Sequence, residues 1–336
     1  MSLPGPRPRL AAQGRATFVA PRWLAGRHAQ TVFAALVRLP IKLPLKRERW
    51  ELPDGDFLDV DVLPAPTLDS PVVVVCHGLE GSSKAGYVRG LLRELERHGL
   101  GAVAINFRGC SGHMNRLPRF YHSGETGDLA FVVDKLRGER SGRAIGLAGF
   151  SLGGNVVTKY LGERGDAVAP EVRAGAVVSV PFDLAEACRV LDGPGVMAWV
   201  YRRRFLKRLR AKIAAKARAV AGVDVAAADG ARNLREFDDR VTAPLHGFLS
   251  AADYYARSSS GPLLPAVKRP LYIVASADDP FIPATAIPRA AAAANPFVTL
   301  DEFAGGGHVA FVHGPPWSPI RFAERRVADF LAEQLR

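Results

Sequence analysis

The sequence predicts an α/β fold in which a mostly parallel sheet is covered by helices on both faces. From Val72 onward, short apolar runs alternate with segments whose apolar residues recur at helical spacing, as in chains of βαβ units. Ahead of these runs, an Asp-Gly turn within residues 53–56 separates two strand-like segments, which predicts an antiparallel hairpin at the start of the sheet. A chain of 336 residues can bury such a core as one domain.

The elements are expected in the following order. Residues 1–46 form an N-terminal extension that packs on the core through a short helix within 23–33. The expected strands are 47–52, 57–63, 72–76, 102–107, 144–150, 174–180, 271–275 and 297–303, and the expected helices are 87–98, 124–136, 154–161, 288–294 and 320–335. Ser123 is expected to cap the second of these helices, with Glu125 and Asp128 in its first turn. Residues 47–336 then form one α/β domain, in which 182–261 are a helical lid insertion between two strands.

The segment around Ser151 carries the strongest functional signal. Residues 149–153 have the pattern Gly-x-Ser-x-Gly, with an apolar strand before the turn and a helix after it. This order is required at a nucleophile elbow, where a strained turn needs glycine on either side of the serine. The serine hydroxyl is then held at the carboxyl edge of the sheet, beside the positive end of the helix. We expect Ser151 to be a nucleophile.

A serine nucleophile needs a base, and the base needs an acid that orients it. His308 follows three glycines in a loop after the last strand, and we expect it to be the base, with His313 as the fallback. Asp278 and Asp279 both follow the strand 271–275. We favour Asp279, because an acid followed by a short apolar step and a proline is usual in this loop; Asp278 is the alternative, and would otherwise brace the turn. The chain order Ser, Asp, His is the one found in α/β hydrolases.

An oxyanion hole completes this expected site. One donor is the N–H of Leu152, which follows the nucleophile, and the other is the N–H of Leu79 in the loop 77–83. We expect His77 to order that loop. The remaining candidates for a base, His28, His98 and His246, are expected to be structural or solvated.

Charge is concentrated in one segment. The formal net charge is +12, but residues 193–223 contain nine bases and no acid, which leaves only +3 for the rest of the chain. Phe205, Leu209 and Ile213 recur at helical spacing there, so we expect a basic amphipathic helix in the lid with a solvated basic face. The alternative is peripheral contact with an anionic membrane or acidic lipid. We expect no nucleic-acid partner, because no aromatic platform or reader motif accompanies the charge.

The cysteines and the first residues bear on the compartment. Cys76, Cys110 and Cys188 are an odd set without C-x-x-C spacing, which favours buried thiols in a reducing compartment over disulfides or zinc ligands. The first 20 residues contain arginines and prolines but no continuous apolar run, and no later run is long enough to cross a bilayer. We expect a cytoplasmic protein without a signal peptide.

These motifs together resemble the YheT-like α/β hydrolases, the AB hydrolase family four. The resemblance implies the triad Ser151, Asp279 and His308 and hydrolysis of short- to medium-chain acyl esters or lipids, with no metal or organic cofactor. The sequence departs from the family at Ala310, where glycine is common, and at His113, where an acid is usual. The matching blocks, in chain order from Trp23 to Phe311, are WLAGRHAQT, HGLEGSS, NFRGCSG, YHSGETGDL, GFSLGGN, ADDPFIP and GGHVAF.

The sequence is compatible with two functions other than ester hydrolysis. The same triad would serve an acyltransferase or thioesterase, and a non-catalytic binder of a lipid or small molecule is an alternative of another class. The complete triad argues against a binder, which has no need of all three groups. Arg108 follows a strand and is expected to brace the site by pairing with Glu125 or Asp128. Acyl length, alcohol group and oligomeric state are left open by these motifs.

Overall fold

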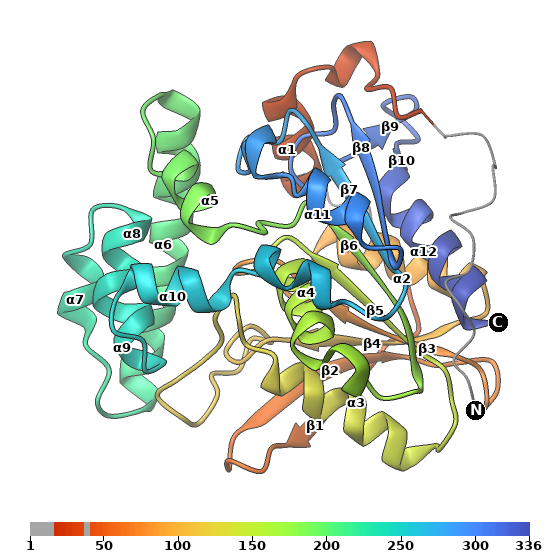
Figure 1. Cartoon of the computed structure of the whole chain (residues 1–336). Coiled ribbons are helices and arrows are strands. Elements are labelled where there is room, and N and C mark those ends of the chain that lie inside the picture. The colour runs from red at the N-terminus through yellow and green to blue at the C-terminus, as the bar shows by residue number, and fades with distance from the viewer. Residues whose placement is uncertain (1–16, 37–40) are drawn as a thin grey trace.

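The computed structural model describes residues 17–36 and 41–336, so the arginine- and proline-rich segment 1–16 lies outside the described residues. Within these ranges the centre is an eight-stranded sheet with the order β1-β2-β4-β3-β5-β6-β7-β8. β1 and β2 pair antiparallel and β2 joins β4 antiparallel, whereas all later pairings are parallel (Figure 1). The expected hairpin and parallel sheet are confirmed. The strands are β1 Lys46–Glu51, β2 Phe57–Leu63, β3 Val72–Cys76, β4 Gly101–Asn106, β5 Ile145–Phe150, β6 Val172–Val178, β7 Leu271–Ser276 and β8 Val298–Phe303.

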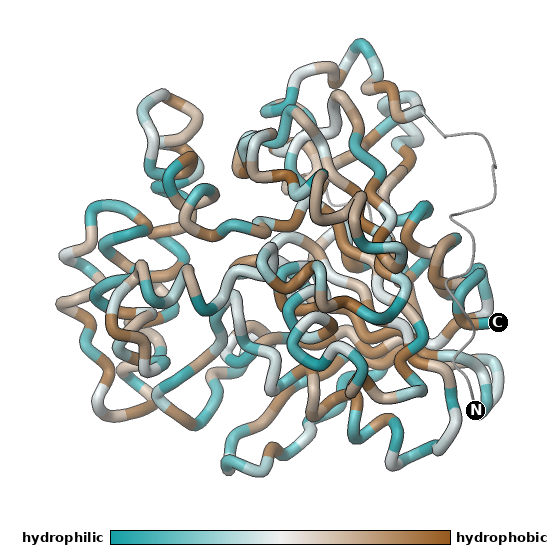
Figure 2. Tube along the Cα trace, in the orientation of Figure 1, coloured by the Kyte–Doolittle hydropathy of each residue, from teal (hydrophilic) through white to brown (hydrophobic). Residues whose placement is uncertain are grey.

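Helices cover both faces of the sheet. Within β3, Val73 and Val75 pack with α2 and α12 on one face, and Val72 and Val74 pack with α3 and α4 on the other. This two-sided burial explains why the central strands are continuous apolar runs, which Figure 2 shows as the brown interior. The helices around the sheet are α1 Arg27–Leu36, α2 Gly86–Arg97, α3 Gly127–Glu139, α4 Leu152–Arg164, α11 Arg289–Ala294 and α12 Phe322–Leu335. Short 3₁₀ turns and the two-stranded pair β9 Val312–His313 and β10 Ile320–Arg321 complete the loops.

A helical insertion lies between β6 and β7. It forms a group of helices to one side of the sheet in Figure 1, in which the connection from α5 to α6 stands away from the body. A π-helical turn, Asp238–Thr242, interrupts it. Its helices are α5 Leu184–Leu191, α6 Val196–Ala219, α7 Val225–Asp229, α8 Leu234–Phe237, α9 Ala243–Leu245 and α10 Ala251–Ser258.

The expected cap at Ser123 is wrong. α3 begins at Gly127, and its N-cap residue, Thr126, makes no capping hydrogen bond with its side chain. The Ser123 hydroxyl instead accepts a hydrogen bond from Tyr254 Oη at 2.8 Å. The strand expected at 174–180 also ends earlier, because the chain turns at Ser179, whose φ is +52°.

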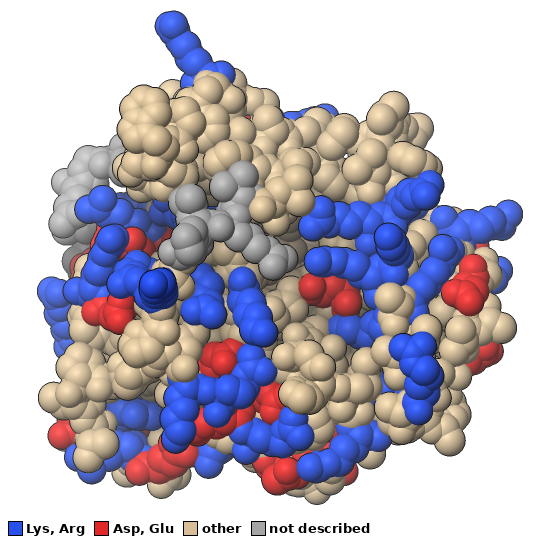
Figure 3. All heavy atoms as spheres, turned by 180° about the vertical axis from the view of Figure 1, so that it is seen from behind, with Lys and Arg blue, Asp and Glu red and all other residues tan. Residues whose placement is uncertain are grey.

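The solvated basic face expected on the lid helix, α6, is present only in part. Lys212 and Lys216 are buried, and Lys216 Nζ donates to the Asn115 carbonyl at 3.0 Å. Arg210 donates to the carbonyl of Ala228 at 3.2 Å. The C-terminal half of this helix is therefore tied to the protein by its bases, and the exposed bases concentrate in its N-terminal half. On the rear face of the molecule as a whole, Lys and Arg side chains lie interspersed with Asp and Glu (Figure 3).

Candidate active site

The turn between β5 and α4 has the geometry that the glycine pattern predicts. Ser151 has φ +52° and ψ −121°, a conformation that few residues with a side chain adopt. A Cβ on Gly149 would lie 2.4 Å from the Gly153 carbonyl oxygen, and a Cβ on Gly153 would lie 2.4 Å from the Cys76 carbonyl oxygen. Both glycines are needed because the backbones approach too closely for any side chain.

Ser151, His308 and Asp279 meet at the carboxyl edge of the sheet. His308 Nε2 lies 2.9 Å from Ser151 Oγ, and His308 Nδ1 lies 2.8 Å from Asp279 Oδ2. Asp279 is buried, and its Oδ1 also accepts hydrogen bonds from the backbone N–H groups of Phe281 and Ile282. A carboxylate only accepts, so Nδ1 of the imidazole carries the proton and Nε2 is left to accept the serine proton.

The alternative acid and the fallback base lie elsewhere. Asp278 Oδ1 accepts hydrogen bonds from the N–H of Gly307 at 2.9 Å and from the hydroxyl of Ser276 at 2.6 Å. It therefore braces the glycine-rich loop and does not touch the His308 ring. His313 lies on β9, where its ring packs against the rings of Phe18 and Phe322.

The other histidines have structural partners. His28 Nδ1 lies 3.0 Å from the Tyr201 hydroxyl, and His98 pairs with Asp329 at 2.9 Å. The His246 ring packs against Phe120, and burial lowers the pKa of His246 to about 3. These contacts fit the structural roles expected for the three histidines.

The loop 77–83 is held so that the Leu79 N–H can face the site. His77 is fully buried; its Nδ1 donates to the Gly78 carbonyl at 2.7 Å and its Nε2 accepts from the Phe107 N–H at 3.2 Å. Burial lowers the pKa of His77 to about 3, so the ring stays neutral and cannot serve as the base. Leu79 and Leu152 line the cavity beside Ser151, and in the described part of the chain neither N–H donates to a protein acceptor. Both donors remain available for an oxyanion.

A buried ion pair ties this loop to the insertion. Glu80, with φ +54°, donates its N–H to Tyr121 Oη, which in turn donates to Glu80 Oε1; both distances are 2.8 Å. Lys212 Nζ on α6 pairs with the same carboxylate oxygen at 2.5 Å. This contact was not predicted from the sequence. The available signal was an acid within the HGLEGSS block together with a helix that contains bases and no acids.

Helix α1 braces the loop that carries His308, and this role was also missed. The His308 N–H donates to Thr31 Oγ1 at 3.0 Å. Gln30 is fully buried; its side chain accepts from the Val312 N–H at 2.9 Å and donates to the Val312 carbonyl at 2.8 Å. The signal was the presence of Gln and Thr at the end of the WLAGRHAQT block.

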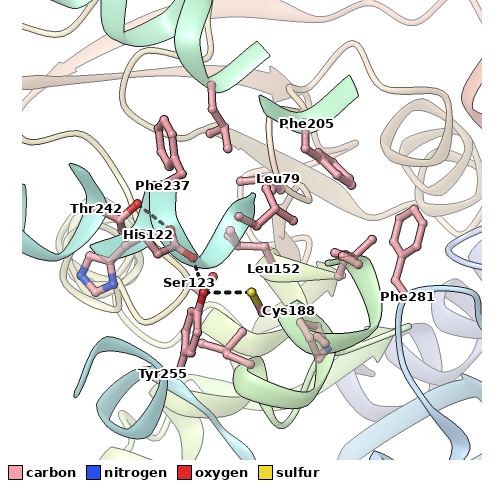
Figure 4. Close-up of a pocket in the computed structure, with 18 of the residues that line it drawn as sticks. Leu79, His122, Ser123, Leu152, Cys188, Phe205, Phe237, Thr242, Tyr255 and Phe281 are labelled. Atoms are coloured by element: carbon pink, nitrogen blue, oxygen red, sulfur yellow. Dashed lines mark hydrogen bonds between the residues drawn. The ribbon is translucent and has the colours of Figure 1, made fainter. Parts of the chain in front are cut away.

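Two cavities meet at Ser151 and His308. One, of about 140 Å³, runs beneath the insertion between apolar walls that include Leu152, Phe205 and Phe281 (Figure 4). The other, of about 320 Å³, lies between α1, the loop 77–87 and α6. An ester whose carbonyl sits at Ser151 can thus extend its acyl and alcohol halves in two directions.

Arg108 braces the end of β4 away from the reacting groups. It forms a two-pronged contact with buried Asp128, at 3.0 and 2.7 Å, and its other terminal nitrogen pairs with Asp54 and Asp56. These carboxylates raise the pKa of Arg108. Of the two expected partners Asp128 is correct, whereas Glu125 pairs with Arg119 at 3.2 Å.

All three cysteines are free; Cys76 and Cys188 are buried, and Cys110 is partly buried. In the described ranges no cluster of three or more His, Cys, Asp or Glu side chains is placed to hold a metal ion. None of the helices that those residues form is long and apolar enough to cross a membrane.

Comparisons with known proteins identify the fold and the family. The sequence profile described as the alpha/beta hydrolase fold matches residues 71–315. The chain is 37% identical over 325 residues to the candidate esterase YheT of Escherichia coli strain K12, which covers 95% of this chain and 94% of that protein. It is 29% identical over 273 residues to a Saccharomyces cerevisiae protein named monoacylglycerol lipase, covering 79% of this chain and 59% of that one. A solved esterase from Pyrococcus furiosus has the same fold, with a TM-score of 0.56 and 18% identity over 88% of this chain and 94% of that one.

Proposed function

Because this chain belongs to the α/β hydrolase fold family and is a carboxylic ester hydrolase of the YheT-like group, we propose that Ser151, Asp279 and His308 are its catalytic triad. The observation that carries the proposal is the unbroken line of hydrogen bonds from the Asp279 carboxylate through the imidazole to Ser151 Oγ. Each group has the role that acyl transfer to a serine requires.

The proposed reaction has two halves. His308 Nε2 takes the proton of Ser151 as Oγ attacks the ester carbonyl, and the Leu79 and Leu152 N–H groups stabilise the oxyanion, each by about 3 kcal/mol. The imidazolium then gives that proton to the leaving alcohol, and the acyl group stays on Ser151. In the second half, His308 takes a proton from water as the water attacks the acyl-enzyme, which releases the acid and restores the serine.

We propose short- to medium-chain acyl esters or lipids as substrates, with residues 182–261 acting as the lid. Support comes from the apolar walls of the cavity beneath the insertion, to which the insertion contributes Leu184, Phe205 and Phe237. The name of the yeast relative, a monoacylglycerol lipase, also favours an acyl lipid.

The test is labelling by a fluorophosphonate probe together with ester hydrolysis. Ser151→Ala is expected to abolish labelling and to lower turnover about a million-fold. Ser82→Ala is the matched control, because Ser82 also lines a cavity at the site but has no base beside it, and it should label normally. Asp279→Asn should lower kcat about 10⁴-fold, and Asp278→Asn far less. Absence of labelling in folded wild-type protein would contradict the proposal.

We also propose that the N-terminal end of α6 contacts anionic membranes. Val196 and Trp199 are 78% and 50% exposed, and the exposed bases Arg203 and Lys207 follow on the same helix. The wider cavity opens beside this end of α6. α1 and the α5–α6 connection lie at the same end of the molecule (Figure 1). On the face drawn in Figure 3, this end has few charged side chains. Apolar side chains beside bases are suited to the interface of an anionic bilayer.

Vesicle co-sedimentation tests this contact. Wild-type protein is expected to bind phosphatidylglycerol vesicles more tightly than phosphatidylcholine vesicles, and Trp199→Glu should weaken that binding. Leu249→Glu is the matched control, because Leu249 is 95% exposed in the loop after α9. Equal binding of the two variants would contradict the proposal. A cytoplasmic location is part of this proposal, and the free thiols support it.

A further inference from the structure

The cavity beneath the insertion changes character along its length. Leu79 and Leu152 line it beside the reacting groups, whereas hydroxyl and carboxyl groups of the insertion line its other end. Figure 4 shows the hydrogen bonds that run from Thr242 to Cys188 at this polar end, with Phe205 and Phe281 on the opposite side of the two leucines. A cavity built only for alkyl chains would have no such groups.

Asp238 is at the centre of this polar end. Its Oδ1 accepts a hydrogen bond from Thr242 Oγ1 at 2.7 Å, and its Oδ2 accepts one from Tyr255 Oη at 2.6 Å. Tyr255 Oη also lies 3.1 Å from Cys188 Sγ. Asp238 begins the π-helical turn of the insertion, a local geometry that is frequent at functional sites.

The Asp238 carboxyl retains capacity to bind a donor from a ligand. Its side chain is partly buried and lines the cavity, and in the described part of the chain its carboxylate oxygens accept hydrogen bonds from Thr242 and Tyr255. Burial raises the pKa of Asp238 to about 6, so the group is mostly ionised above neutral pH. A carboxylate has about four acceptor positions, of which the protein fills two.

The free-energy balance favours a polar ligand group at this position. A plain alkyl chain that reached Asp238 would displace water from the carboxylate and leave its remaining acceptor positions empty, which is costly. A hydroxyl group on the chain would donate to the carboxylate and remove that cost. Hydrogen bonds to charged groups are stronger than those between neutral groups.

We propose that Asp238 forms a subsite for a hydroxyl group on the substrate, so that this hydrolase prefers esters that carry a hydroxyl on the half that enters the cavity beneath the insertion. The inference rests on the proposed function, because the preference is expressed only if Ser151 cleaves the ester at the other end of the same cavity. It makes Asp238 a specificity-determining residue that takes no part in the bond changes.

Two matched substrate series test the subsite. One consists of p-nitrophenyl esters of straight-chain acids of increasing length, each with and without a terminal hydroxyl. The other consists of acetate esters of linear alcohols and of the diols of the same length. When the chain is long enough for its terminal hydroxyl to reach Asp238, one series should show a kcat/KM about tenfold higher for the hydroxylated ester than for the plain ester of the same length. This is the factor expected for a hydrogen bond to a charged group. The responding series identifies which half of the ester enters the cavity.

Variants assign the preference to the carboxylate. Asp238→Asn should reduce it and Asp238→Val should abolish it. Asp239→Asn is the charge-matched control, because Asp239 is exposed and accepts the Ala251 N–H, and it should leave the preference intact. If Asp238→Val fails to fold, the Asn variant still decides the result.

The outcomes separate the two proposals. Hydrolysis of plain and hydroxylated esters at equal rates in both series would overturn the subsite and leave the triad standing. A preference that persists unchanged in Asp238→Asn would also overturn the subsite. If no ester is hydrolysed and the fluorophosphonate does not label Ser151, the proposed function fails and the subsite fails with it.

Discussion

Replacement of Thr31 by valine should impair the reaction without touching the triad. The side chain of Thr31 is buried and its hydroxyl is the acceptor for the His308 N–H. Valine has nearly the same shape but no acceptor, so the variant leaves a backbone N–H unsatisfied beside the imidazole. Such a group costs about 1–3 kcal/mol. If the whole cost falls on the reactive arrangement of His308, kcat decreases about 5- to 150-fold, and KM changes little because the substrate walls are intact.

The assay is steady-state hydrolysis of a p-nitrophenyl ester combined with the rate of fluorophosphonate labelling. Thr31→Ser retains the hydroxyl and should keep most of the activity. Thr158→Val is the second control, because Thr158 is fully buried but its hydroxyl donates only to the Gly154 carbonyl of its own helix. Wild-type kcat in Thr31→Val, at unchanged melting temperature, would refute the idea that α1 positions the base.

Two further predictions concern buried charges. Glu80→Gln leaves the Lys212 ammonium without its carboxylate, so it should lower the free energy of unfolding measured in urea by about 3–5 kcal/mol. The double variant Glu80→Gln/Lys212→Met removes both charges and should regain most of that stability. A double variant as unstable as the single one would contradict this prediction. Burial raises the pKa of Glu324 from 4.5 to about 7, so the folded state binds this proton more tightly than the unfolded state. The contribution of Glu324 to the free energy of unfolding is fully present below about pH 4.5 and is lost as the pH rises through 7. The loss is on the order of 3 kcal/mol. Glu324→Gln should remove that slope from urea-unfolding curves measured across this range, and an unchanged slope would contradict it.

The sheet was predictable because its central strands are buried on both faces. β3, β4, β5 and β7 are fully buried and consist almost entirely of apolar and small residues. Ser151 was also recognisable, because close backbone approach on both sides admits only glycine. Asp278 and Asp279 could not be separated in this way. Both follow the same strand, and the direction of each side chain depends on the turn after it.

Long-range contacts account for the errors and omissions. Ser123 looked like a cap, but Tyr254, 131 residues away, competes for its hydroxyl. Lysine is rarely buried, so nothing local indicated that Lys216 would lie inside the protein among backbone carbonyls of residues 115–117. The brace between Gln30 and Val312 joins residues 282 apart, and only the folded chain brings them together.

The brace from α1 has a consequence for how activity develops during synthesis. The ribosome makes the chain from its N-terminus, at about 5–20 residues per second. Gln30 and Thr31 are made early, but the loop that they hold appears only after His308 and Val312 have been added. The ribosome therefore makes all eight strands of the sheet before it adds the proposed base. Under the proposed function, ester cleavage requires that β8 and the loop after it have docked against α1.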